Sequence, residues 1–145
     1  MSTLTLRYSR DPNDDFARLF VSVETANFSA TVSFWVQWQD IEDLGSSLKA
    51  YPIAPDASIT ASWGFEQGIG DDLIIGLSIA PFNVRGTLLV GVELADQYDR
   101  AQRLKASFKS DYANLDSFGR ALRRMLKGDF EEAVLLESVP DHWLF

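Results

Sequence analysis

The sequence predicts a single α+β domain built from two copies of a strand-rich unit, each ending in a strand followed by a helix. Three observations predict this class. Apolar residues recur at every second position along most segments, the period changes to a helical one in two places, and those two places align with each other. We expect about βββα followed by ββββα, with mostly antiparallel sheets, two helices packed on the apolar face and a pseudo-twofold relation between the halves.

Composition agrees with one soluble domain and excludes several functions. The chain of 145 residues is 46% hydrophobic, which is typical of a globular domain. It contains no cysteine, so disulfides and thiolate metal sites are excluded. No secretory signal follows Met1 and no apolar run approaches the roughly 20 residues of a membrane span, so we expect a cytoplasmic protein. The net charge of -8 argues against general binding to nucleic acid or anionic membrane.

The first unit opens with three predicted strands, at Thr3–Tyr8, Ala17–Thr25 and Phe28–Val36. Only Ala26 and Asn27 separate the last two, and an asparagine that takes a positive φ would suit a tight hairpin. In the third strand, alternate residues are expected to face the core, namely Phe28, Ala30, Val32, Phe34 and Val36. Helical spacing then links Ile41, Leu44, Leu48 and Tyr51, with Asp40 as the expected N-cap.

The second unit repeats the order with one strand more. Strands are predicted at Ile59–Phe65, Leu73–Ala80, Thr87–Ala95 and Leu104–Ser110, with Leu88, Val90, Val92 and Leu94 facing the core. A helix should start at Asn114 as N-cap and end before Gly128 as its C′ residue. The remaining residues, 129–145, form a tail in which Ala133–Leu136 is either an edge strand or a frayed end of the helix.

A direct alignment supports the duplication. Leu19–Ala26 matches Leu88–Ala95 at five of eight positions, and Ser33–Leu48 aligns with Ser107–Leu122. The extra residues of the second copy fall between Asp96 and Arg103, in a predicted hairpin loop where insertions are tolerated. We therefore place the first repeat at about 1–52 and the second at about 58–128. The alternative is a chance similarity between two amphipathic strand-helix units.

Trp35 is the most informative candidate for a contact surface. It interrupts the polar face of its strand, and Phe20 is out of phase with its apolar neighbours in the same way. Exposed aromatic residues among small polar ones are typical of a binding surface. The alternative is that the C-terminal tail or a second sheet covers this face. Trp38 and Tyr112, just before the two helices, are expected to wedge helix against sheet.

Charge is unevenly distributed along the chain. Residues 100–127 carry eight of the 13 basic side chains, and Arg120 and Arg124 lie on the outward face of the second predicted helix. These could receive an acidic partner or form an ordinary solvated helix face. Acidic pairs occur in two loops, at Asp14 and Asp15 and at Asp71 and Asp72, where they could contact a basic partner.

No catalytic, cofactor or metal motif is found. The stretch Asp11–Asp15 begins like a calcium loop, but Phe16 stands where the loop needs glycine. The single histidine, His142, lies beside Asp141 in a terminal segment, and adjacent residues on an extended chain cannot form a triad pair. The glycines at 64, 68 and 70 lack the lysine of a phosphate loop. We therefore expect neither an enzyme nor a resident cofactor.

The two strand-helix units resemble small bacterial families, some of them grouped with the immunity proteins of contact-dependent toxin systems of the WapI type. The resemblance rests on Phe28–Val36 running into Ile41–Leu48, and on Leu104–Phe108 followed by Asp111, Leu115, Phe118 and Leu122. It implies a non-catalytic cytoplasmic protein that binds one protein partner, and it carries over no catalytic residue.

The leading hypothesis is therefore a non-enzymatic binding module, with an immunity-like protein as its sharpest version. One alternative is a structural or assembly protein that dimerises through a strand edge or the Trp35 face. Another is a small-molecule-binding protein with a cavity between sheet and helices. We expect the chain to be either a monomer or a homodimer.

Overall fold

The computed structural model describes residues 1–11, 13–66, 69–128 and 132–139, and it confirms the α+β class. Two four-stranded antiparallel sheets are present. The first sheet has the order β3 (Ser29–Gln37), β2 (Phe16–Glu24), β1 (Thr3–Tyr8) and β8 (Glu132–Leu136). The second has the order β4 (Ile59–Gly64), β5 (Leu73–Pro81), β6 (Thr87–Ala95) and β7 (Arg103–Asp111). The helices are α1 (Trp38–Ser47) and α2 (Tyr112–Leu126), and a short 3₁₀ turn spans Gly70–Asp72.

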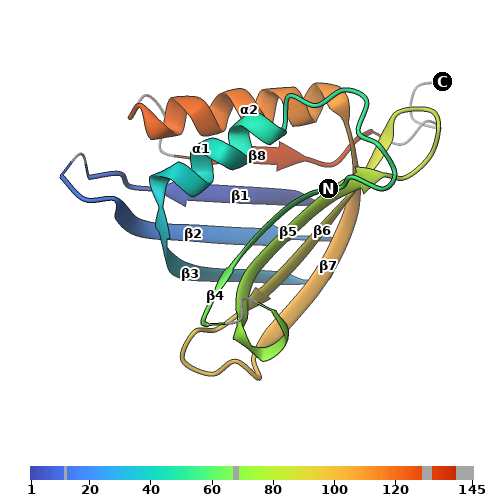
Figure 1. Cartoon of the computed structure of the whole chain (residues 1–145). Helices are drawn as coiled ribbons and strands as arrows, with labels where there is room; N and C mark the ends of the chain where they lie inside the picture. Colours follow the sequence, from blue (N-terminus) through green and yellow to red (C-terminus); the bar gives the residue numbers. More distant parts are fainter. Residues whose placement is uncertain (12, 67–68, 129–131, 140–145) are drawn as a thin grey trace.

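One continuous core lies between the two sheets and beneath the helices. In the second sheet its members include Leu88, Val90, Val92 and Leu94, as the period-2 pattern predicts. The first sheet contributes the inward residues of β1 and β2, of which Leu6, Leu19 and Val21 have no exposed surface. Both helices lie over the first sheet, and the second sheet runs steeply away from it (Figure 1). Each sheet therefore keeps one outer face that no described helix or strand covers.

The two halves exchange a strand. Strand β4 follows α1 in the chain but pairs with β5, the first strand of the second half. Strand β8 follows α2 but pairs with β1, the first strand of the first half. The strand orders β3-β2-β1-β8 and β7-β6-β5-β4 are therefore equivalent. Each half is a βββαβ unit, and its last strand completes the sheet of the other half.

The helices cross at a pair of equivalent glycines, Gly45 and Gly119, which also coincide in the sequence alignment. A Cβ atom on Gly45 would lie 3.9 Å from Cβ of Leu122, and a Cβ atom on Gly119 would lie 3.4 Å from Cβ of Leu48. Leu48 and Leu122 are themselves equivalent, so the contact is reciprocal. The two glycines therefore lie at the contact between the helices, where an added Cβ atom would make only ordinary van der Waals contacts.

Both helices begin three residues earlier than predicted, so the N-cap predictions for Asp40 and Asn114 are wrong. The N-caps are Gln37 and Asp111. The Asp111 carboxylate accepts a hydrogen bond from the Asn114 backbone N–H at 2.8 Å, and it supplies the cap that the prediction gave to Asn114. At the other end of α2, Gly128 has φ of 84° and is the predicted C′ residue.

The prediction that Phe28 faces the core is also wrong. Phe28 is 64% exposed because β3 begins one residue after it, and the side chain lies at the hairpin between β2 and β3. The hairpin itself is tight, with the Thr25 N–H donating to the Phe28 carbonyl, but no described residue other than glycine has a positive φ. Asn27 therefore does not use the left-handed conformation expected of it. The other inward positions of β3 pack against the core, with Val36 buried and Ala30, Val32 and Phe34 partly buried.

Part of the predicted tail forms a strand. β8 pairs with the full length of β1 up to Arg7, and Ala133 and Leu135 have no exposed surface. Of the two alternatives for this segment, the edge strand is correct. Asp141, His142 and the other residues from 140 onward lie outside the described residues. Within the described part, neither helix is long and apolar enough to cross a membrane.

Candidate functional site

A hollow of about 370 Å³ lies at the seam where β3 of the first sheet meets the end of β4 of the second. Five aromatic side chains line it, from three separate segments: Phe16, Phe34, Trp35, Trp63 and Phe65. Phe16, Trp35 and Phe65 are 47%, 53% and 42% exposed. The ring of Phe34 contacts that of Phe65 edge-on, with centroids 5.4 Å apart, and joins the two sheets across this seam hollow.

The position of Phe65 depends on Gly64, the last residue of β4. The register of β4 against β5 shifts between Trp63 and Gly64. A Cβ atom on Gly64 would lie 2.0 Å from the Asp72 carbonyl oxygen, so no other residue fits without moving the backbone. The next residue closes the loop, because the Phe65 N–H donates to the same Asp72 carbonyl at 2.8 Å. The bulge therefore directs Phe65 out of the sheet and toward β3.

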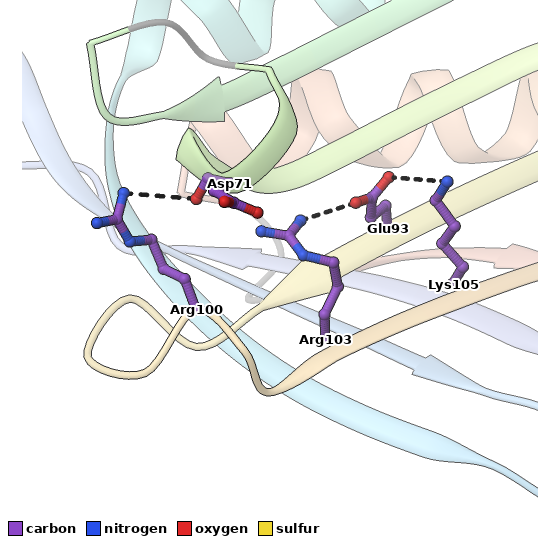
Figure 2. A network of polar contacts seen from close by, with 5 residues as sticks. All are labelled: Asp71, Glu93, Arg100, Arg103 and Lys105. Atoms are coloured by element: carbon purple, nitrogen blue, oxygen red, sulfur yellow. Dashed lines mark hydrogen bonds and ion pairs between the residues drawn. The ribbon is translucent and has the colours of Figure 1, made fainter.

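A polar network holds the loop that carries Phe65. Arg100, from the β6–β7 loop, donates to the Asp71 carbonyl at 3.4 Å and forms an ion pair with Asp72 at 2.8 Å. Its guanidinium also lies 5.0 Å from the centroid of the Phe65 ring. Figure 2 shows the contact between Arg100 and Asp71 beside a second group, in which Glu93 lies between Arg103 and Lys105. Arg100 thus positions the aromatic ring that forms one wall of the seam hollow.

Among the described residues, the ionisable side chains that line the seam hollow are both acidic. Asp40 lies in the first turn of α1, and Glu66 follows Phe65. Within the described ranges, neither carboxylate has a hydrogen bond or ion pair. A second hollow of about 350 Å³, between α1 and β4, shares Asp40 and adds Asp43. Acidic side chains therefore extend along the α1 side of β4.

The predicted outward direction of Trp35 is confirmed. It lies on the outer face of the first sheet opposite Arg18, whose guanidinium is 5.5 Å from the Trp35 ring centroid. Phe20 is on the same face, opposite Ser33, and is partly covered by Arg7 at 4.7 Å from its ring centroid. No described element covers this face. Trp35 lines the seam hollow, whereas Phe20 does not.

The predicted acidic loops approach the seam hollow from its two sides. Asp14 accepts a hydrogen bond from the Phe16 N–H, and Asp15 accepts one from the Trp38 indole at 3.3 Å. Asp71 and Asp72 form the turn that binds the Phe65 backbone. These four residues therefore hold the site in place and do not line it.

The predicted basic residues of α2 lie elsewhere. Arg120 forms an exposed i,i+4 ion pair with Asp116 at 3.1 Å. Arg124 is exposed in the last turn of α2 and, like Arg120, does not line the seam hollow. The sequence patterns do not mark as site residues six that line the seam hollow, namely Phe16, Phe34, Trp63, Phe65, Asp40 and Glu66. The available signal was the placement of Phe16 and Phe65 beside acidic loops.

A larger groove of about 630 Å³ lies over the outer face of the second sheet. Its floor consists of small residues on neighbouring strands, among them Gly76, Ser78 and Gly91. This is a different place from the cavity between sheet and helices expected for a small-molecule site. Its charged groups already pair with each other, because Glu93 binds both Arg103 and Lys105. The groove therefore offers hydroxyl groups and apolar surface but no free charge to orient a ligand.

Tyr8, the last residue of β1, binds the end of β3 beside the seam hollow. Its hydroxyl donates to the Val36 carbonyl at 2.8 Å, and the side chain is buried. Burial raises the pKa of Tyr8 above its ordinary value of 10.0, while a backbone hydrogen bond and Arg10 act in the opposite direction. The neutral hydroxyl is therefore the form that the folded protein favours.

We expect Tyr8→Phe to lower the free energy of unfolding by about 1–2 kcal/mol at neutral pH, because the Val36 carbonyl loses its donor. In the wild type, Tyr8 makes its full contribution to the free energy of unfolding below the unfolded-state pKa of about 10. This contribution is lost as the pH rises through the folded-state pKa, which is higher. Urea unfolding between about pH 8 and about pH 11 tests this. Equal alkaline losses in wild type and variant would show that Tyr8 is not the group responsible.

No group of three or more histidine, aspartate or glutamate side chains in the described residues is placed to hold a metal ion. No protein-family model matches the chain, and neither a curated protein nor a solved structure does.

Proposed function

We propose that this chain is a non-catalytic binding protein that docks one protein partner on the seam hollow. One observation carries the proposal: three large aromatic side chains, each about half exposed, converge from separate segments on a single concave site. Aromatic side chains in such a position dominate the binding energy of protein interfaces, and their exposure costs a soluble protein stability and solubility unless they serve a contact.

The sharpest version of the proposal is an immunity-like protein whose partner is a toxin domain. The acidic groups Asp40 and Glu66 at the hollow, together with the net charge of -8, would complement a basic active site on such a domain. Its first test is genomic. A toxin-domain gene immediately upstream supports this version, and consistent occurrence beside unrelated metabolic genes counts against it.

A binding experiment compares the wild type with Trp35→Ala for affinity to the purified product of that neighbouring gene. We expect at least a tenfold loss of affinity by calorimetry, on the order of what a central aromatic residue contributes. Phe28→Ala is the matched control, because Phe28 is 64% exposed on the same strand pair but lies at the far hairpin. Equal affinities for wild type and Trp35→Ala would refute docking at the seam hollow. Light scattering on the chain alone decides the alternative of a homodimer through this face.

A further inference from the structure

We infer that the group received by the seam hollow is a cationic side chain, an arginine of the partner, inserted among the aromatic rings and held by Asp40 and Glu66. This inference rests on the proposed function and adds the chemistry of the bound group. It starts from the lining of the hollow, where the described residues supply five aromatic rings, two carboxylates and no basic side chain.

The faces of the aromatic rings favour a cation. A guanidinium over Trp, Tyr or Phe is attracted by the negative face of the ring, most strongly where water is excluded. Two aromatic rings of this hollow already contact a guanidinium group of the chain itself. Arg18 lies over Trp35 and Arg100 lies over Phe65, with neither arginine among the residues that line the hollow.

The carboxylates of Asp40 and Glu66 also favour a cationic ligand group. Within the described part of the chain, Asp40 and Glu66 have no partner of their own. An apolar guest would cover them without supplying a hydrogen bond, and an anionic guest would be repelled. A guanidinium supplies a planar fork of donors that can bind a carboxylate through two hydrogen bonds and still stack on a ring, which an ammonium group cannot do equally well.

Acidic side chains continue beyond the seam hollow along α1. The adjoining hollow between α1 and β4 shares Asp40, Ser62 and Trp63 and adds Asp43, again with no basic residue in its lining. Residues that precede or follow the inserted arginine in the partner would therefore meet negative charge along α1. This continuity predicts a basic segment as the occupant, in preference to a small free cation.

The test uses short capped peptides and the full-length chain. The probe is an acetylated, amidated Gly-Arg-Gly peptide, and the comparison peptides carry lysine, the neutral isostere citrulline, or glutamate in the central position. Binding is followed by the indole N–H signals of Trp35 and Trp63 in nuclear magnetic resonance. We expect the arginine peptide to bind at least fivefold more tightly than the citrulline peptide, the lysine peptide to be intermediate, and added salt to weaken binding.

Charge variants locate the effect. The double variant Asp40→Asn with Glu66→Gln should weaken binding of the arginine peptide at least fivefold. The matched control, Glu42→Gln with Asp56→Asn, removes the same charge from exposed positions that line neither hollow and should leave binding unchanged. Citrulline binding as tightly as arginine, or equal losses in the two double variants, would overturn the inference.

These outcomes separate the inference from the proposed function. If the arginine peptide does not shift the two indole signals but Trp35→Ala still weakens the partner complex, docking stands and the cationic guest is wrong. If the arginine peptide binds as expected and Trp35→Ala leaves the partner complex intact, the hollow takes a cation but is not the docking site. A longer basic peptide that binds no better than the tripeptide would indicate a small free cation as the guest.

Discussion

Ending the chain at Gly128, and so removing β8, is expected to unfold the protein. This strand fills the edge of the first sheet beside β1 and buries Ala133 and Leu135 completely. Truncating one buried leucine to alanine typically costs about 2–5 kcal/mol, and the loss of β8 also uncovers apolar surface of α2, which packs on it. The sum approaches the whole stability of a domain of this size, about 5–15 kcal/mol. Circular dichroism and urea unfolding give the readout.

A chain that ends at Val139 is the matched control, because it retains every described strand. We expect it to keep a cooperative unfolding transition. The point variant Leu135→Ala supplies an intermediate case, with an expected loss of about 2–5 kcal/mol. If the chain ending at Gly128 unfolds with wild-type stability, the exchange of β8 between the halves contributes nothing to the fold.

Gly64→Ala is expected to destabilise the protein by about 3 kcal/mol and to displace Phe65 from the seam hollow. The added methyl group would meet the Asp72 carbonyl oxygen at 2.0 Å, and the atom that must move belongs to the backbone. The movement breaks the hydrogen bond from Phe65 to Asp72 and so releases the loop. Urea unfolding measures the stability, and binding of the arginine peptide measures the integrity of the site.

Gly45→Ala tests whether the destabilisation expected of Gly64→Ala is specific to position 64. A Cβ atom on Gly45 has its nearest neighbour at 3.7 Å, an ordinary contact, and alanine favours the helix interior by about 1 kcal/mol over glycine. We expect this variant to be as stable as the wild type or slightly more stable. The bulge at the end of β4 would not require glycine if the two substitutions had the same effect.

Strands were predictable because buried residues recur at every second position along much of their length. Strands β1 and β6 have the predicted limits, since each presents one face to the core. The starts of the helices were not predictable, because Trp38 and Tyr112 continue the period-2 pattern of the strands before them. In α2 the N-cap also depends on the side chain of Asp111. Phe28 was misplaced because a period-2 pattern does not show where a strand begins.

The candidate site was only partly predictable, for a different physical reason. Trp35 is out of phase with its own strand, so its outward direction follows from local periodicity. The association of Trp35 with Trp63 and Phe65 depends on how the end of β4 approaches β3, which is a contact between distant segments. The spacing of these residues along the chain carries no signal for that contact.

Because each half gives its last strand to the sheet of the other, the two halves are linked in the same way in both directions. Thr3 lies opposite Leu136 in the register of β1 and β8, and the Glu137 N–H donates to the Ser2 carbonyl, so residues near the two ends of the chain are neighbours. Gly64 and Leu73 are opposed in the same way across β4 and β5, with the loop of residues 65–72 between them. The pair of Thr3 and Leu136 is therefore equivalent to the pair of Leu73 and Gly64, which the loop of residues 65–72 connects.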